Sequence, residues 1–395
     1  MSQEQGSADQ LRWYGAAQLI ALVRAEPGIT RAAAASRLGI SSGGAADLLA
    51  RLRRRRLLDE QPAAAQGRGR PTTVLTAHPQ GPLVLAAEVR AADWRLAIAG
   101  LDGQPAVIAA GKHAGKRVNR MLAELGSAIA AARRGEPDRV SAISVSVAGT
   151  ISDSRLVQFT TRGWKDVDLS VLTDGFPDGA GVPLLTGNDA TLAGLAEARN
   201  GAARSAGTAL HLIVAVGLGG TLVVDGAPVT GAHGAAGEYG HVPFGDPRLR
   251  CPCGARGCWD LTIDGRALAR HIGDPAPEDP VGYAYALLAR TPAARERRAF
   301  SKVAAALGAG IGGLVNLHDP DVVTLGGLAV ALRAASPNAF AAAYLDGLMA
   351  FRKTAVPPVR DGVHGDDAPL QGAVIQGLDH LTSETALAEW ARRRR

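Results

Sequence analysis

The stretch HVPFGDPRLRCPCGARGC, residues 241–258, is the most informative part of the chain. It holds all three cysteines of the protein within eight residues, and His241 precedes them after a spacer of nine residues. Three thiolates and one imidazole form the ligand set of a closed, tetrahedral structural zinc site. Such a site has no open position for a water molecule, so the metal builds a loop and does not perform hydrolysis. We therefore predict a structural Zn²⁺ bound by His241, Cys251, Cys253 and Cys258.

Two other interpretations of this stretch are weaker. Three reduced core thiols beside an unrelated histidine would more often be scattered along a chain than gathered in one loop. A disulfide framework is disfavoured by the odd number of cysteines and by an N-terminus without the pattern of a secretory signal.

Length, composition and charge limit the class of protein. At 395 residues the chain predicts two or three domains, and 47% apolar residues suffice for large cores. No apolar run approaches the ~20 residues that span a bilayer, so we expect a cytoplasmic protein without a membrane partner. Residues 1–80 contain eleven arginines against six acidic residues, and Arg392 to Arg395 form a basic C-terminal run. A basic N-terminal module is typical of a protein that binds a polyanion.

Residues 10–56 have the pattern of a helix-turn-helix. Residues 10–24 show apolar side chains at helical spacing, and Pro27-Gly28 ends that helix. We expect a second helix over 32–37 with Thr30 as N-cap, a tight turn at Gly39, and a third helix from Ser42 to about Arg56 capped by Ser41. The third helix should bury Leu48, Leu49 and Leu52 and expose Asp47, Arg51, Arg54 and Arg55. This geometry places a recognition helix in the DNA major groove.

Two predicted strands, 57–60 and 72–76, complete a winged helix. Arg68 and Arg70 lie between them in a Gly-Arg-Gly-Arg-Pro segment, which fits the narrow minor groove of A·T-rich DNA. The recognition helix begins with small residues, so we expect modest base specificity. A protein-docking winged helix with a solvated arginine stripe remains the alternative. The predicted contacts to double-stranded DNA are Arg31, Ser41, Ser42, Gly43, Arg51, Arg68 and Arg70.

The rest of the chain alternates strand and helix patterns, which indicates an α/β class. Predicted strands lie at 83–87, 95–100, 141–147, 182–185, 209–216 and 221–224, with residues 217–220 joining the last two. Predicted helices lie at 120–133, 190–200 and 300–317, and residues 319–327 form a strand ending in a glycine turn.

A winged helix ending in Gly-Arg-Gly-Arg-Pro, followed by this body and the His-Cys-Cys-Cys cluster, resembles the ROK family of repressors, open reading frames and sugar kinases. The resemblance runs from about residue 10 to 380, and its most specific part is GAHGAAGEYGH, residues 231–241. It implies a body of two α/β lobes of the actin-like ATPase type that bind sugar and ATP between them. We expect a winged helix-turn-helix over 1–80 and a ROK sugar-kinase-like body over 81–395, with the zinc loop at 238–260.

The resemblance also implies a set of ligand-binding residues. Asp189 matches the base that deprotonates the sugar hydroxyl in the kinases, and Asn188 matches a hydroxyl ligand. A helix-capping turn is the alternative for this pair. Thr160 stands where the family has an asparagine, and Asp260 replaces a glutamate. His241 is implied to serve both metal and sugar, one nitrogen for each. The predicted ligand-binding set is Thr160, Asn188, Asp189, Glu238, His241 and Asp260.

Two departures from the family concern ATP. The first phosphate loop of the family is an Asp-x-Gly-Gly-Thr hairpin, but residues 88–93 read EVRAAD. Without a glycine, we expect that the backbone neither turns tightly nor approaches a phosphate, and Glu88 adds a repelling charge. At the second loop, Ala215-Val216-Gly217 replaces Gly-Thr-Gly. These changes predict that the chain is no enzyme and that Asp189 is not catalytic.

Together these features predict a sugar-responsive DNA-binding regulator, a repressor of carbohydrate-utilisation genes that acts as a homodimer or homotetramer. Sugar binding would change operator affinity through thermodynamic linkage. Two alternatives remain open. One is an active ATP-dependent sugar kinase with an added DNA-binding domain. The other is a regulator controlled by a protein partner, which the threonine at position 160 keeps possible.

Overall fold

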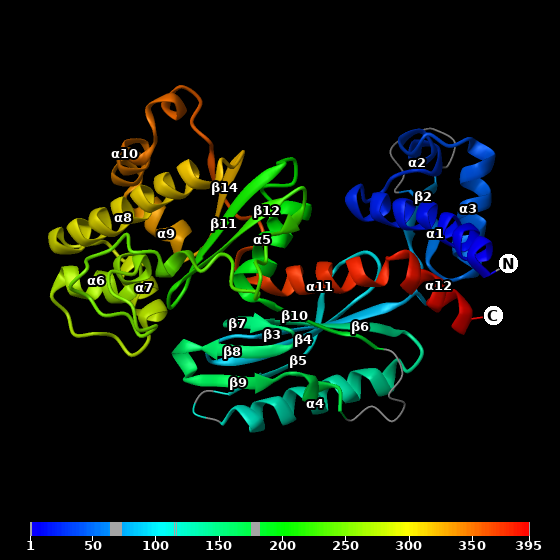
Figure 1. The fold of residues 1–395 in the computed structure, drawn as a ribbon, viewed down its shortest axis with the longest axis horizontal. Helices are drawn as coiled ribbons and strands as arrows, with labels where there is room; N and C mark the ends of the chain where they lie inside the picture. The colour runs from blue at the N-terminus through cyan, green and yellow to red at the C-terminus, as the bar shows by residue number, and fades with distance from the viewer. Residues whose placement is uncertain (1, 64–72, 114, 116, 175–181, 395) are drawn as a thin grey trace. The chain divides into compact units, whose positions relative to one another are not determined.

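The computed structural model describes residues 2–63, 73–113, 115, 117–174 and 182–394. Its N-terminal part is a winged helix-turn-helix (Figure 1). Its two strands pair antiparallel, with Leu58 opposite Ala77. The helices and strands that the sequence predicts here are all present, although the first helix begins earlier than expected. The elements are α1 (Ser2–Ala25), α2 (Arg31–Leu38), α3 (Ser42–Arg54), β1 (Leu58–Pro62) and β2 (Thr73–Ala77).

Local hydrogen bonds explain where these helices begin and end. The Thr30 hydroxyl accepts from the backbone N–H of Ala33 at 3.2 Å, and the Ser41 hydroxyl accepts from that of Gly44 at 3.1 Å. Gly39 ends α2 with φ of 64°, a conformation that glycine adopts without strain. Both predicted caps and the predicted turn are therefore confirmed. The side chains that α3 buries include the three predicted ones, Leu48, Leu49 and Leu52.

Contacts within the chain divide it into two compact units. The first comprises residues 1–146, 168–186 and 373–395, and the second comprises residues 147–167 and 187–372. The first unit takes in the winged helix together with the sheet that follows it. The predicted domain boundary at residue 80 therefore stays a prediction.

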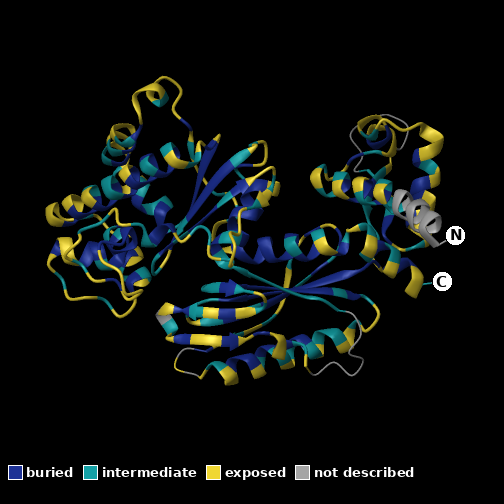
Figure 2. Ribbon diagram, viewed as in Figure 1, coloured by how far each residue is buried: buried dark blue, intermediate teal, exposed yellow. Residues whose placement is uncertain are grey.

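The first unit is built around a five-stranded sheet with the strand order β10-β6-β3-β4-β5. All seven residues of β3 are buried, because the strand lies in the middle of the sheet (Figure 2). The amphipathic helix α4 packs against β4 and β5 through Met121, Leu122, Leu125 and Ile129. The elements are β3 (Leu83–Val89), β4 (Asp93–Ala99), β5 (Ala106–Lys112), α4 (Val118–Gly135), β6 (Val140–Val147), β10 (Leu184–Asn188), α11 (Ala368–Leu381) and α12 (Glu384–Arg393).

The second unit contains another five-stranded sheet, with the order β13-β12-β11-β14-β15. Its middle strand β11 pairs antiparallel with β12 and parallel with β14. The strands are β11 (Thr208–Val214), β12 (Leu218–Val224), β13 (Ala227–Pro228), β14 (Val322–Gly327) and β15 (Val359–Asp361). The helices are α5 (Asp189–Asn200), α6 (Gly265–Ile272), α7 (Pro280–Leu288), α8 (Ala294–His318), α9 (Leu328–Ala335) and α10 (Pro337–Gly347).

Helix α8 is the central helix of this unit. Its side chains Val303, Leu307, Ile311 and Leu314 are fully buried in one core with those of β11 and β14. By length and composition it is the one helix of the described residues that could cross a membrane, but 56% of its most apolar window is buried inside the protein. Burial against other protein elements accounts for its apolar character.

A three-stranded sheet of β7 (Thr150–Ser152), β8 (Arg155–Phe159) and β9 (Trp164–Asp168) completes the α/β fold. One predicted loop is wrong, because residues 218–220 belong to β12 and the β11–β12 turn is residues 215–217. Gly219 and Gly220 sit in a strand for a packing reason. A Cβ atom added to Gly219 would lie 2.7 Å from the Cβ atom of Ala190. A Cβ atom added to Gly220 would lie 2.8 Å from the Tyr239 ring.

Candidate functional site

The four predicted metal ligands converge in the loop of residues 238–260, which we call the metal loop. One ligand atom from each of His241, Cys251, Cys253 and Cys258 lies within 4.8 Å of the others. The Nδ1 atom of His241 is 3.7 Å from the Sγ atom of Cys251, and the Sγ atoms of Cys253 and Cys258 are 3.6 Å apart. A tetrahedral zinc with Zn–S bonds of ~2.3 Å separates its sulfurs by ~3.8 Å. The donor atoms therefore fit such an ion.

Backbone turns bring the cysteines together. The backbone N–H of Gly254 donates to the carbonyl of Cys251 at 3.0 Å, and that of Cys251 donates to the carbonyl of Ala255 at 2.9 Å. Gly254 and Gly257 have φ values of 102° and 68°, which other residues rarely adopt. Burial raises the pKa of the Cys258 thiol to about 12. Because a metal binds the thiolate, an ion in this loop would have to displace that proton.

Trp259, the first residue of the 3-10 helix Trp259–Thr262, packs the metal loop against α8. Its indole N–H donates to the backbone carbonyl of Ala306 at 3.0 Å, and only a glycine at position 310 leaves room for the ring. The indole is 1% exposed. The loop is thus fixed to a core helix on one side.

His241 separates the metal cluster from a polar site. Its Nδ1 atom faces the cysteines, while its Nε2 atom lies 3.9 Å from the Oε2 atom of Glu238, too far for a direct hydrogen bond. The two ring nitrogens thus face different partners. That one nitrogen serves a metal and the other a ligand, as the resemblance implied, stays a prediction.

Two neighbouring residues at the start of β7 hold the polar site together. The Thr150 hydroxyl donates to the Oε1 atom of Glu238 at 2.9 Å, and the Nδ2 atom of Asn188 donates to the Gly149 carbonyl at 3.0 Å. Sequence reasoning missed Gly149 and Thr150 as site residues, although both follow closely after the strand predicted at 141–147. A small residue followed by a hydroxyl at a strand end was the signal available.

Asn188 and Asp189 also cap α5. The Oδ1 atom of Asn188 accepts from the backbone N–H of Thr191 at 3.1 Å, and the Oδ1 atom of Asp189 accepts from that of Ala190 at 2.8 Å. The capping alternative from the sequence is therefore confirmed for Asn188. Capping occupies the amide oxygen only, and both side chains stay half-buried at the end of β10.

Asp260 is the most buried acid of the predicted ligand set. It is 6% exposed, and its Oδ1 atom has no hydrogen-bond partner among the described residues. Its Oδ2 atom lies 3.5 Å from the Arg266 guanidinium, and a Cβ atom on Gly217 would be 3.1 Å from that oxygen. Burial raises the pKa of the Asp260 carboxyl, and the Arg266 charge opposes this effect. A buried carboxylate oxygen without a partner is a natural acceptor for a ligand hydroxyl.

Thr160 lies at the edge of this group. It is exposed at the start of a 3-10 helix, and its hydroxyl accepts from the Gln158 amide at 2.7 Å. The preceding residue, Phe159, packs on Gly149, where a Cβ atom would be 3.3 Å from the Phe159 Cα atom. Thr160 is thus next to the site through the backbone, and its hydroxyl accepts one hydrogen bond while its own proton can still be donated.

The position of the first phosphate loop differs from expectation in two ways. β3 and β4 form a tight hairpin without glycine, closed by the Arg90 N–H donating to the Asp93 carbonyl at 2.9 Å. The expectation that the backbone could not turn tightly is therefore wrong. Glu88 also does not present a free charge, because it is 2% exposed and its Oε2 atom accepts from the Arg95 guanidinium at 2.5 Å. A cross-strand ion pair neutralises it.

Arg266 stabilises the turn of residues 215–217, which stands at the position of the second phosphate loop. Its guanidinium donates to the Val216 carbonyl at 2.8 Å and also to the carboxylate of Asp264, which caps α6. The β11–β12 turn closes with the Ala215 N–H donating to the Gly217 carbonyl at 2.8 Å. The turn is therefore held by one backbone hydrogen bond of its own and by the Arg266 guanidinium.

Most of the predicted DNA contacts lie on the exposed face of the winged helix. Ser42, Gly43 and Arg51 are exposed on α3, and Ser41 is exposed as its cap. Arg31 is exposed but forms an ion pair with Glu60 of β1 at 3.3 Å. Arg55, expected on the polar side, is half-buried and bonds to carbonyls of α12. Arg68 and Arg70 lie outside the described residues.

Comparisons with known proteins agree with this architecture. The model of the ROK family matches residues 96–379. A crystal structure of a ROK family transcriptional regulator, a homologue of the E. coli MLC protein, superposes with a TM-score of 0.74 at 20% identity, over 97% of this chain and 100% of that one. A ROK hexokinase from Thermus thermophilus superposes with a TM-score of 0.60 at 26% identity, over 76% of this chain and 99% of the hexokinase.

Similarity to curated sequences is partial in length. A xylose repressor of Bacillus spizizenii is 27% identical over 186 residues, which are 46% of this chain and 47% of the repressor. The predicted fold, an N-terminal helical module before a two-lobed α/β body, is confirmed by these matches together with the described structure.

Proposed function

Since the chain belongs to the ROK family, we propose that it is a DNA-binding transcriptional regulator that responds to a sugar and represses genes of carbohydrate use. The observation that carries this proposal is the extent of the structural similarity. The ROK regulator superposes on 97% of the chain, whereas the hexokinase superposes on 76%. The additional part includes a winged helix whose recognition helix has exposed Ser42, Gly43 and Arg51. Arg68 and Arg70 of the wing would add minor-groove contacts.

The proposed effector is a sugar or sugar derivative bound by Thr160, Asn188, Asp189, Glu238, His241 and Asp260. Two features support this class of ligand. Three carboxylates and an imidazole offer acceptors and donors for the hydroxyl groups of a sugar, and Thr150 orients Glu238 by a hydrogen bond of 2.9 Å. The unpartnered Oδ1 atom of Asp260 would gain a donor from a ligand hydroxyl.

The metal loop would bind Zn²⁺ through His241, Cys251, Cys253 and Cys258. The ion would supply rigidity to the loop that carries Glu238 and His241. Because His241 has one nitrogen toward the cysteines and the other toward Glu238, a rigid loop would link ligand binding to the surrounding core. We expect a cytoplasmic homodimer or homotetramer, in which paired winged helices meet two half-sites of an operator.

Phosphate transfer would be lost in this chain. Glu88 is buried in an ion pair with Arg95 at the place of the first phosphate loop, and no glycine there allows a phosphate to approach the backbone. The hydroxyl of the second loop is replaced by Val216. Asp189 would then contact the sugar without transferring anything to it.

The test is fluorescence anisotropy of the full-length protein on labelled DNA from upstream of its own gene, at fixed salt, with a panel of free and phosphorylated sugars. One sugar should change the affinity for DNA about 5–150-fold, and Glu238→Ala should abolish that change. Absence of DNA binding would contradict the regulator. DNA binding that no sugar alters would contradict the sugar as signal and favour a protein partner.

The second candidate function is that of an active sugar kinase. Asp189 keeps the position of the kinase base beside Asn188, and a hexokinase has the same body fold. Sugar-dependent release of ADP from MgATP, lost in Asp189→Asn, would establish it. No release with any sugar of the panel would exclude it.

A further inference from the structure

The C-terminal helix α12 is joined to the end of the recognition helix α3. The indole N–H of Trp390 donates to the Arg55 carbonyl at 2.7 Å. In return, the Arg55 guanidinium donates to the carbonyls of Ala391 at 2.8 Å and Arg394 at 3.2 Å. These bonds connect residues more than 300 positions apart in the sequence. The end of α3 and the end of α12 therefore form one surface within the first unit.

Four exposed arginines lie at these two helix ends: Arg54, Arg56, Arg392 and Arg393. We call them the terminal basic cluster. In the part of the chain that the structure describes, no carboxylate lies within ion-pair distance of any of the four, whereas the adjacent Arg53 pairs with Asp59 at 2.8 Å. Unpaired cations gathered at one place indicate an anionic partner.

A further arginine increases the density of charge. Arg394 stacks on the Trp390 ring at 4.1 Å and donates to the Asp138 carbonyl at 3.3 Å. Burial and the nearby charge of Arg56 lower the pKa of Arg394, with Arg139 adding to the effect. Like charges this close repel one another, and an anion beside them would relieve that repulsion.

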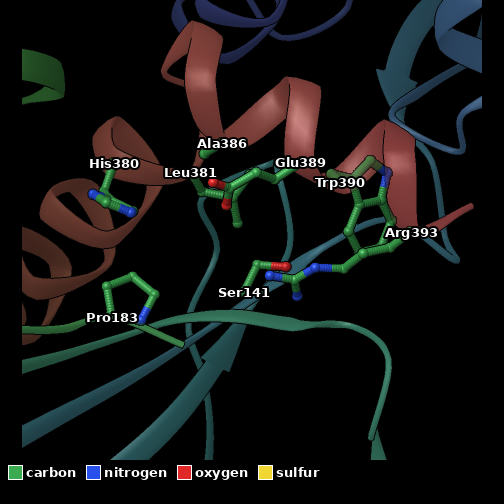
Figure 3. A pocket seen from close by; sticks show the side chains of 8 residues that line it. All are labelled: Ser141, Pro183, His380, Leu381, Ala386, Glu389, Trp390 and Arg393. Carbon is green, nitrogen blue, oxygen red and sulfur yellow. The ribbon is translucent and has the colours of Figure 1, made fainter. Parts of the chain in front are cut away.

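A small-molecule site does not explain the cluster. Arg393 and Trp390 line a cavity together with Ser141 and Glu389, as Figure 3 shows. Its volume is about 30 Å³, enough for roughly two water molecules. Glu389 would also repel a small anion there. Arg54, Arg56 and Arg392 do not line the cavity, and Arg393 is exposed as well as lining it. The exposed guanidinium groups therefore favour an extended polyanion outside the cavity.

We propose that Arg392 and Arg393 contact the phosphate backbone of DNA beside the C-terminal end of α3. The inference rests on the proposed DNA binding and adds a part of the molecule that lies more than 300 residues from the recognition helix. In helix-turn-helix proteins the start of the recognition helix reads bases, and in homeodomains its C-terminal end contacts the backbone. The 13 residues of α3 span ~20 Å, which exceeds the ~12 Å width of the major groove. Its basic end therefore reaches the level of the phosphates.

The contact is sequence-independent, so its signature is the salt dependence of binding. We would measure the affinity of the full-length protein for a random-sequence duplex and for its own upstream DNA across a range of salt. The double variant Arg392→Ala/Arg393→Ala should lower the slope of log K against log salt by about 1.8, at ~0.9 per phosphate contact. The double variant should lower the affinity for both DNAs by the same factor. Arg392→Lys/Arg393→Lys should restore the slope, since lysine also binds phosphate as a point charge.

The matched control is Arg297→Ala/Arg298→Ala, which removes two adjacent exposed arginines from α8 in the second unit. An unchanged slope in the α12 variant would overturn the inference, and so would an equal fall in the α8 control. The experiment distinguishes failure of this inference from failure of the proposed function. If the unaltered protein does not bind DNA at all, the regulator proposal fails first. If it binds with a slope that the α12 variant shares, only the inference about α12 fails.

Discussion

In the β3–β4 hairpin, the carboxylate of Glu88 lies 2.5 Å from the Arg95 guanidinium, while in the metal loop the Oδ1 atom of Asp260 has no partner among the described residues. Both acids are buried. The hairpin thus satisfies its charge within the protein, and the metal loop leaves hydrogen-bonding capacity unused. Buried polar groups are nearly always satisfied, so an unused one suggests a partner that binds later. The two buried acids therefore differ in whether the protein itself supplies a partner for the carboxylate.

The largest expected effect is on the metal loop. Cys258→Ser removes a fully buried ligand and should abolish zinc binding and cost more than ~4 kcal/mol of stability, as loss of a structural metal does. Elemental analysis and calorimetry measure zinc content and Tm. Arg256→Ala, an exposed change in the same loop, should leave both unchanged. A Cys258→Ser protein with one zinc per chain and the parental Tm would contradict the site.

The next largest effect tests the hairpin. Arg95→Met leaves Glu88 buried beside an apolar side chain and should cost about 3–5 kcal/mol. Calorimetric unfolding measures the loss. The double variant Glu88→Leu/Arg95→Met should recover most of it, because neither charge is then buried. A single-variant loss below ~1 kcal/mol would mean that the ion pair does not hold the hairpin, and the contrast with the metal loop would weaken.

His211 provides another buried polar atom without a partner among the described residues, outside the predicted ligand set. It is 1% exposed in β11, its Nδ1 atom bonds the Thr324 hydroxyl at 2.9 Å, and its Nε2 atom has no partner among the described residues. Burial lowers its pKa from 6.5 to about 4. Between these values the unfolded chain binds a proton that the folded chain does not, so stability falls as the pH falls.

The expected loss is about 3 kcal/mol by pH 4. His211→Gln cannot titrate, so its Tm should fall less than that of the parent between pH 7 and pH 5. Acid release of a metal would affect both proteins alike. Equal pH dependence in the two proteins would show that folding does not lower the pKa of His211. Unchanged effector binding in His211→Gln would show that a buried atom without a partner does not by itself mark a ligand site.

Glu238→Ala tests the ligand side directly. It removes the carboxylate that Thr150 orients and should remove a sugar-dependent shift in DNA affinity of ~1–3 kcal/mol. Stability should change little, because Glu238 is exposed. Glu278→Ala, an exposed acid of the same unit outside the metal loop, is the control. Anisotropy titrations with the active sugar measure the shift, and a retained shift would remove Glu238 from the ligand set.

The smallest expected effect lies in the wing. Arg68→Ala or Arg70→Ala should weaken binding by about 1 kcal/mol, roughly fivefold, and mainly at A·T-rich sites, where the minor groove is narrow. Arg37→Ala, whose side chain pairs with Glu26 at 3.5 Å, is a control in the same module. Titrations against A·T-rich and G·C-rich duplexes measure the difference. Equal losses on both would indicate plain phosphate contacts.

Sequence patterns were sufficient where structure is local. The four metal ligands span 18 residues, and the turn-forming glycines between them are visible in the sequence. The caps Thr30 and Ser41 act three residues away, so their roles could be predicted as well. Strand β5 was missed because most of its side chains are exposed and form no buried face, and β7 to β9 were missed because short strands carry little periodicity.

Long-range contacts could not be predicted in the same way. Glu88 was expected to repel phosphate, but the register of β3 and β4 places it opposite Arg95. Thr150 meets Glu238 across 88 residues, and Trp390 meets Arg55 across 335. The sequence by itself determined the His-Cys-Cys-Cys cluster, the winged helix and the α/β class, because short-range turns, caps and periodicity specify them. Only the tertiary structure decided which charges are paired and which are left for a ligand, because packing of distant elements sets those distances.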